Sequence, residues 1–106
     1  MVLLLDYGAM NLSESQKKFL RGLGHQLKPV VTVGDAGLSN SVMQEFDSTI
    51  SHHELIKVRV RAGSRESRDT LIDELCSKGA GNLVQRIGNV ALIYRSNPDK
   101  PRIKLP

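Results

Sequence analysis

The chain has 106 residues, which is enough for one domain with a modest core and too few for two. Lys and Arg number 15 against 11 Asp and Glu, so the formal net charge is only +4, and a polyanionic partner must be argued from where the charges lie. The single Cys76 excludes an internal disulfide and a cysteine-rich zinc site, and no apolar run reaches the ~20 residues of a membrane span.

Aromatic residues are scarce, with two Phe, two Tyr and no Trp. Nucleic-acid readers of the RRM type stack bases on several aromatic side chains, so this composition argues against that class. A lone cysteine suits a reducing compartment. We therefore expect a cytoplasmic protein without membrane attachment. A monomer is also expected, although nothing in the sequence identifies the oligomeric state.

The two ends of the chain differ from its middle. Residues 1–9 lack the cationic start and long apolar stretch of a signal peptide, and we expect them to be an extension outside the domain. The domain is expected over residues 10–97. Residues 98–106 form a basic tail punctuated by proline, for which we expect an extended conformation.

Between these ends the hydrophobic periodicity changes in a regular order. The expected elements are a helix after Ser13 ending at Gly24, a strand over 27–33, a helix after Ser39, a strand over 55–61, a helix after Ser64 ending before 79–81, and strands over 83–87 and 90–94. The positions expected to face the core of the three helices are Phe19, Leu20 and Leu23, then Val42, Met43, Phe46 and Ile50, then Leu71, Ile72, Leu75 and Cys76.

The order αβαβαββ predicts an α/β fold with a four-stranded mixed sheet. Helical crossovers join parallel strands, and the tight turn at Gly88-Asn89 joins an antiparallel pair. In the strand 55–61, basic residues alternate with aliphatic ones, which indicates that one face of the sheet is wet. We therefore expect a two-layer sandwich with the helices on one face.

The turn after the first strand is a Gly-x-x-Gly sequence, Gly34-Asp35-Ala36-Gly37, followed by Leu38 and a helix. Two glycines without Cβ atoms let a ligand approach the backbone, and the N–H groups at a helix start favour an anion such as phosphate. The alternative is a plain strand-to-helix connection that needs a positive φ. Asp35 would repel a phosphate, so either its side chain points away or the turn is a weaker phosphate clamp.

Basic residues on two elements could neutralise neighbouring phosphates. They are Lys17, Lys18, Arg21, His25 and Lys28 around the first helix, and Lys57, Arg59 and Arg61 on the sheet. Either set could instead be an ordinary solvated surface, and the sequence leaves open which of the two is the main surface. Arg86 and Arg95 near the last hairpin, and Lys100, Arg102 and Lys104 in the tail, could extend the basic surface.

Catalytic and metal-binding patterns are not evident. His52-His53-Glu54 at the entry to a strand is interpreted as a turn and packing feature, because no second ligand set has metal-binding spacing. The Gly-x-x-Gly turn lacks the Lys-Ser/Thr of a phosphate-binding loop of nucleotidases and the glycine spacing of a dinucleotide site. We expect no enzyme activity, cofactor, metal or small-molecule substrate.

Five segments together resemble the CRM domain, the chloroplast RNA splicing and ribosome maturation domain, in its stand-alone bacterial YhbY-type form. They are GLGHQLKPVV (22–31), VGDAGL (33–38), HELIKV (53–58), VQRIG (84–88) and LIYR (92–95). The resemblance covers about residues 10–105 and implies a fold similar to the C-terminal domain of bacterial translation initiation factor three. The acidic Asp35 departs from the basic or neutral turn that is frequent in this family.

The resemblance also implies RNA binding through the Gly-x-x-Gly turn and a basic surface, with bacterial members associated with precursors of the large ribosomal subunit. The expected function is therefore non-catalytic binding of structured ribosomal RNA during large-subunit assembly. The alternatives are a protein–protein adaptor on pre-ribosomal particles, an intron-splicing cofactor like the plant relatives, and an enzyme acting on RNA.

Overall fold

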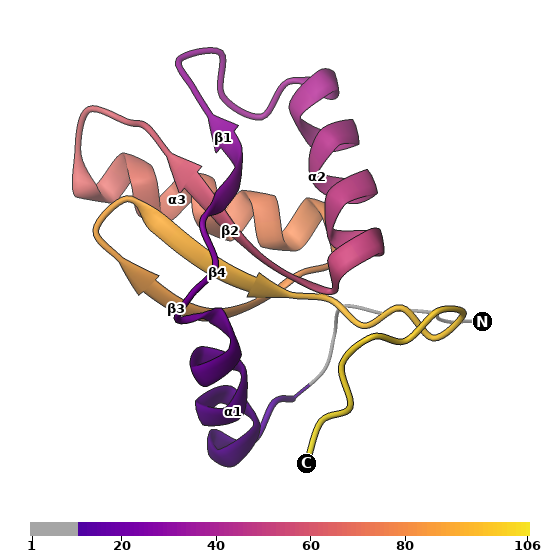
Figure 1. The fold of residues 1–106 in the computed structure, drawn as a ribbon. Coiled ribbons are helices and arrows are strands. Elements are labelled where there is room, and N and C mark those ends of the chain that lie inside the picture. Colours follow the sequence, from indigo (N-terminus) through magenta and orange to yellow (C-terminus); the bar gives the residue numbers. More distant parts are fainter. Residues whose placement is uncertain (1–10) are drawn as a thin grey trace.

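The computed structural model describes residues 11–106, so the expected extension over residues 1–9 lies outside the described part. The elements are α1 (Glu14–Gly24), β1 (Pro29–Val33), α2 (Asn40–His53), β2 (Leu55–Val60), α3 (Arg65–Lys78), β3 (Asn82–Ile87) and β4 (Val90–Tyr94) (Figure 1). This order confirms the predicted αβαβαββ arrangement. β1 begins later than predicted, so that residues 25–28 connect α1 to β1.

The four strands form one mixed sheet in the order β1-β2-β4-β3. β1 runs parallel to β2, whereas β4 is antiparallel to both of its neighbours. Gly88 has a φ of 60° in the turn between β3 and β4, as a tight hairpin requires. The mixed sheet predicted from the sequence is confirmed.

Serine side chains begin all three helices, as the sequence predicts. Ser13 Oγ accepts from Gln16 N–H and Gln16 Oε1 accepts from Ser13 N–H, which is a complete capping box. Ser39 and Ser64 each accept a backbone N–H three residues later. The starts of α2 and α3 are therefore fixed at the ends of β1 and β2.

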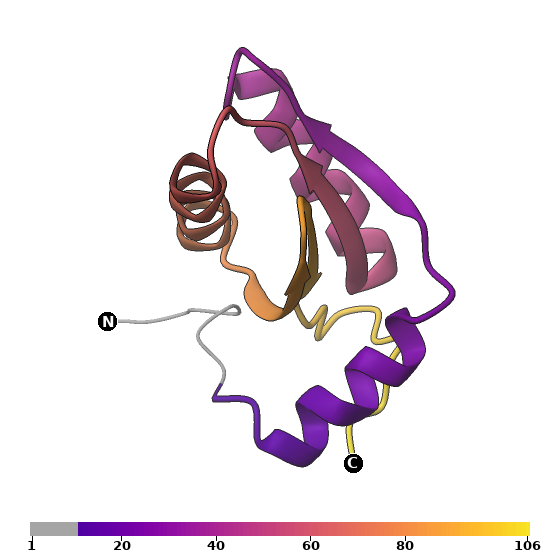
Figure 2. The same cartoon turned by 90° about the vertical axis from the view of Figure 1, so that its left-hand side faces the viewer.

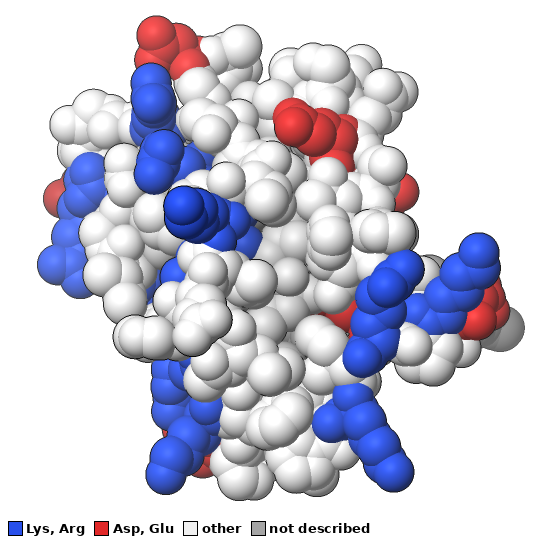
Figure 3. All heavy atoms as spheres, in the orientation of Figure 1, with Lys and Arg blue, Asp and Glu red and all other residues white. Residues whose placement is uncertain are grey.

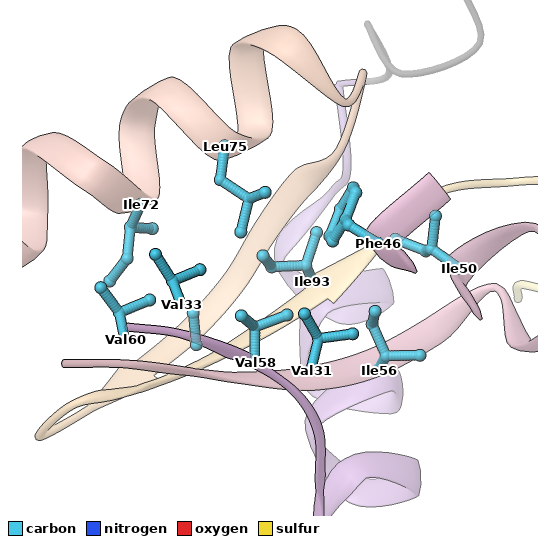
Figure 4. Packing of buried hydrophobic residues seen from close by; sticks show 11 residues of the cluster. Val31, Val33, Phe46, Ile50, Ile56, Val58, Val60, Ile72, Leu75 and Ile93 are labelled. Carbon is cyan, nitrogen blue, oxygen red and sulfur yellow. The ribbon is translucent and has the colours of Figure 1, made fainter. Parts of the chain in front are cut away.

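The main hydrophobic core lies between one face of the sheet and helices α2 and α3. Alternate residues of β2, namely Ile56, Val58 and Val60, face this core together with Phe46 of α2 and Leu75 of α3 (Figure 4). All are at most 2% exposed. The predicted inner faces of α2 and α3 are thus confirmed.

The prediction that all helices cover one face is wrong for α1, which lies on the opposite face of the sheet (Figure 2). Leu20 of α1 packs with Leu55 of β2 and Leu92 of β4, which point away from the main core. A Cβ on Gly24 would lie 2.7 Å from a Leu92 methyl carbon, so glycine allows this close approach. Leu55 belongs to the same face as the basic residues of β2, and it makes one end of that face apolar.

Two other residues of α1 predicted to be core are largely accessible. Phe19 is 39% and Leu23 is 44% exposed, whereas Leu20 is fully buried. α1 packs only on one end of the sheet and therefore buries a narrower stripe than its periodicity suggests.

The C-terminal tail contains no helix or strand, but it is fixed to the domain. Ile103 and Leu105 pack against the cluster around Leu20. Glu54, 1% exposed, accepts hydrogen bonds from the backbone N–H groups of Arg102 and Ile103, each at 2.7 Å, and from that of Asn97. The tail is thus part of the packed structure.

Burial of the thiol of Cys76, with a smaller effect of Asp73, raises its pKa from 9.0 to about 11. Above pH 9.0 the unfolded chain loses this proton while the folded protein keeps it, so stability falls as the pH rises towards 11. We expect urea denaturation at pH 8 and pH 10 to show a smaller decline for Cys76→Ala than for the wild type. Burial also raises the pKa of Tyr94, which lowers stability at high pH in the wild type and in the variant alike. An equal decline in the free energy of unfolding of the two proteins would contradict the assignment to Cys76.

Candidate nucleic-acid interface

The Gly-x-x-Gly turn lies at the carboxyl end of β1. Its backbone is closed by a hydrogen bond from Gly37 N–H to Gly34 O, 3.0 Å, and Gly37 has a φ of 69°. The positive φ confirms one reason for glycine at position 37. At Gly34 φ is not in this region, and a Cβ there would meet no atom within 4 Å. The fold therefore gives no steric reason for glycine at position 34.

Three connections meet at this end of the sheet. Arg61 N–H donates to Val33 O, 2.9 Å, which holds the β2–α3 connection beside the β1–α2 turn. Val60 N–H donates to Asn89 O, 2.7 Å, which places the β3–β4 turn next to the end of β2. The Gly-x-x-Gly turn is thus held beside two other connections at this end of the sheet.

α2 follows the turn and differs from the other helices in its first turn. α1 carries Glu14 and α3 carries Glu66 in the first turn, where a carboxylate satisfies the positive end of the helix dipole. The first turn of α2 has no acidic residue. Its N–H groups and dipole are therefore available to an external anion more than those of α1 and α3.

Asp35 and Ala36 form the exposed tip of the turn. Within residues 11–106, the Asp35 carboxylate accepts no hydrogen bond, so it does not cap local N–H groups there.

A groove runs between α1 and the open face of the sheet. It consists of two adjoining hollows of about 630 and 260 Å³ that share three lining residues. The first is lined by Lys18, Arg21, Gly22, His25, Lys57, Gln85 and Ile87, and the second by Pro29, Lys57, Arg59, Gln85, Ile87, Val90 and Leu92. No carboxylate lines either hollow, so the charged side chains that line the groove are all basic.

The groove joins the two basic sets predicted from the sequence, because residues of the first helix and of the sheet both line it. Lys18, Arg21 and His25 of the α1 region face Lys57 of β2 across it. Arg59 continues the line of cations along β2 towards the Gly-x-x-Gly turn, since it pairs with Thr32 near the end of β1. In Figure 3, Lys and Arg side chains extend over this face from the β1–α2 turn at the top to α1 at the bottom.

Three predicted cations lie outside the groove. Lys17 is 3.7 Å from Glu14 and faces a different hollow, beside Asn82. Lys28 is exposed in the connection to β1, and Arg61 is exposed beyond the end of β2. Arg61 lies on the side of the turn, whereas Lys17 points away from both parts of the surface.

Two arginines that could have extended the basic surface serve the fold instead. Arg95, 9% exposed, donates to Asp47 Oδ1 at 2.8 Å and to Gly79 O at 2.9 Å. Arg86 Nε lies 2.9 Å from Asp69 Oδ1. Neither side chain lines the groove.

Sequence reasoning missed the uncharged lining of the groove, of which Gln85 and Ile87 belong to both hollows. Ile87 is 68% exposed, the highest value among the large apolar residues described. An aliphatic residue directly before the Gly88-Asn89 turn was a signal available in the sequence, because hairpin tips are usually polar.

Residues 11–106 contain no group of three or more His, Cys, Asp or Glu side chains that could hold a metal ion. Within the same residues, no helix has the length and apolar character needed to cross a membrane.

These features define a small α/β domain with an exposed Gly-x-x-Gly turn beside a cationic groove. The chain belongs to the CRS1/YhbY (CRM) domain family, whose model matches residues 12–95. The resemblance drawn from the sequence motifs is thereby confirmed.

Individual relatives are similar over nearly their whole length. The chain is 45% identical to the probable RNA-binding protein of Pseudomonas aeruginosa over 91% of each chain. It is 40% identical to an RNA-binding protein of Haemophilus influenzae, over 90% of this chain and 95% of the relative. The solution structure of a hypothetical Staphylococcus aureus protein superimposes with a TM-score of 0.77 at 32% identity, covering 91% of this chain and all of that one.

Proposed function

We propose that this protein is a non-catalytic RNA-binding protein that holds the phosphate backbone of structured RNA. The observation that carries the proposal is the groove between α1 and the sheet, lined by Lys18, Arg21, His25, Lys57 and Arg59 without a carboxylate. The RNA-binding names of the relatives and the family membership support it independently.

The binding mechanism combines two kinds of phosphate contact. Backbone N–H groups around Gly34–Leu38 and the start of α2 hold a phosphate at the end of the sheet. The cations of the groove neutralise further phosphates along the same RNA strand. Because phosphate contacts carry no sequence information, the protein recognises backbone shape, as expected of a surface poor in aromatic side chains.

The partner we propose is ribosomal RNA in precursors of the large subunit, with the protein acting as a monomer in the cytoplasm. The motif resemblance to bacterial YhbY-type proteins supports this choice. Cross-linking of the protein to RNA in cells tests it: adducts concentrated on precursor large-subunit RNA are expected, whereas protein adducts without RNA would favour the adaptor alternative.

Salt dependence provides the direct test of phosphate binding. If four or five phosphates are neutralised, log K should fall with log[salt] with a slope of roughly −3 to −4.5. The measurement is a fluorescence-anisotropy titration of a structured ribosomal RNA fragment at several salt concentrations. Binding that does not depend on salt would refute the proposal.

Replacing Gly34 by Ala tests the turn more sharply than replacing Gly37. Gly37→Ala would add a Cβ at a φ of 69°, which costs about 1 kcal/mol of stability in itself. At Gly34 a Cβ meets no atom of the protein, so Gly34→Ala should leave the thermal midpoint nearly unchanged. We expect it to weaken RNA binding about tenfold, because the methyl group stands where the RNA backbone approaches.

Gly63→Ala is the matched control, since a Cβ there also meets no atom within 4 Å and φ is not in the left-handed region. This control should keep full affinity. Unchanged RNA binding by a folded Gly34→Ala protein would remove the turn from the binding site.

A further inference from the structure

The inner part of the groove differs from a simple phosphate track, because its floor is aliphatic. This part is the hollow of about 260 Å³, which lies at the end of the groove formed by β2, β3 and β4. We propose that it binds one unpaired nucleotide of the RNA, with the base on the aliphatic floor and the phosphates on Lys57 and Arg59. The inference rests on the proposed function and adds to it a ligand class for one subsite.

The lining of the hollow fits the two chemical parts of a nucleotide. Pro29, Ile87 and Val90 provide accessible apolar surface for the face of a base, above the buried Leu92, and the space is about 260 Å³. Lys57 and Arg59 stand at the same hollow on neighbouring positions of one strand face. Each nucleotide in an RNA chain has one phosphate on its 5′ side and one on its 3′ side. Two cations beside an apolar floor therefore match a base flanked by two phosphates.

Gln85 adds a group that can recognise the edge of a base. Its side chain lines both hollows, between the aliphatic floor and the cations of α1. A primary amide offers one donor and one acceptor group, which is the pattern that pairs with base edges. A phosphate alone would contact neither the acceptor oxygen of the amide nor the apolar floor.

The exposure of Ile87 supports an occupant other than solvent. This side chain is 68% exposed and lines both hollows, and Val90 of β4 pairs with both Ile87 and Arg59. The cations that line the hollow would repel a protein segment that is itself basic, so such a segment is a poor occupant even if it carries apolar side chains. An anionic chain carrying flat apolar groups satisfies both the charge and the aliphatic floor, and RNA has this chemistry.

Only one base can be held in this way. The described part of the chain offers no aromatic platform in the groove on which successive bases could stack. The inference therefore specifies a helical RNA with a single bulged or looped nucleotide, whose flanking helix lies along the cations of α1.

The test uses two RNA hairpins that differ only in one unpaired uridine in the stem. The wild-type protein is expected to bind the bulged hairpin about tenfold more tightly than the fully paired one. Ile87→Ala should abolish this preference, because it removes most of the exposed aliphatic contact, and should leave the salt dependence on both hairpins unchanged. Val30→Ala is the matched control, since Val30 is also exposed, at 50%, and lines neither hollow.

The outcomes separate this inference from the proposed function. Equal affinity of the wild type for both hairpins, or a preference retained by Ile87→Ala, would refute the nucleotide subsite while salt-dependent binding to both hairpins would leave the phosphate track standing. Absence of salt-dependent binding to either hairpin would refute both. A 4-thiouridine at the bulge should cross-link to the β3–β4 hairpin, and cross-links confined to α2 or α3 would also refute the subsite.

Discussion

Replacing Glu54 by Ala is expected to lower the free energy of unfolding by about 3–5 kcal/mol, the largest effect on stability among the substitutions considered. The carboxylate is 1% exposed and accepts the backbone N–H groups of Asn97, Arg102 and Ile103. Its removal leaves the three backbone N–H groups without their acceptor. It also releases the tail, including the packing of Ile103 against the α1 cluster.

Urea denaturation measures this effect, and Glu45→Ala is the matched control. Glu45 is an exposed residue of α2, so its replacement changes the net charge equally and should alter stability by less than about 0.5 kcal/mol. A stability loss below about 1 kcal/mol for Glu54→Ala would contradict the docking of the tail through this carboxylate. Loss of hydrogen-exchange protection at Arg102 and Ile103 should accompany the substitution.

Glu54 has a φ of 65°, so replacing it affects stability in two ways: the hydrogen bonds of the side chain are lost, and the strain of the backbone can be relieved. Glu54→Gly removes the same carboxylate but relieves the left-handed backbone, so it should be about 1 kcal/mol more stable than Glu54→Ala. Glu54 thus combines an unfavourable backbone conformation with a buried carboxyl group, and its hydrogen bonds to the tail offset both costs. A turn and packing feature was predicted at His52-His53-Glu54, but local sequence does not show that the Glu54 carboxyl group binds the distant C-terminal tail.

The elements could be predicted because each carries a local signal. Ser13 with Gln16, the alternation in β2 and the Gly88 turn each depend on residues close in sequence, and all three are confirmed. The side of the sheet on which α1 packs depends on Leu55 and Leu92, which are far apart in sequence. Local periodicity does not report such contacts, and the placement of α1 was therefore wrong.

The candidate site was predictable in its charges but not in its shape. Lys18, Arg21, His25 and Lys57 were all identified, but as two separate surfaces. Only the crossing of α1 to the open sheet face brings them to one groove. Arg95 and Arg86 could not be assigned from the sequence for a separate reason, because their partners Asp47 and Asp69 lie on α2 and α3, far away in the sequence.

The largest expected effect on RNA binding comes from neutralising the two cations of β2. Lys57 and Arg59 are half-buried in the groove, where a phosphate would be partly shielded from water. The double variant Lys57→Gln, Arg59→Gln should lose about 30-fold in affinity for structured RNA, at about 1 kcal/mol for each lost contact. The salt slope should become shallower by about 2, because each lost phosphate contact removes about one unit.

A charge-matched variant distinguishes contact from general attraction. Arg65→Gln with Lys78→Gln lowers the net charge equally, but both residues are exposed on α3, which covers the opposite face of the sheet. Long-range attraction through the net charge would weaken binding similarly in both variants. If the RNA contacts the groove, the α3 variant should keep nearly the wild-type slope of log K against log[salt]. Equal slopes in the two variants would show that the RNA does not bind at this face. Because Gln keeps most of the side-chain length, a changed slope reports the lost charge and not a collapsed groove.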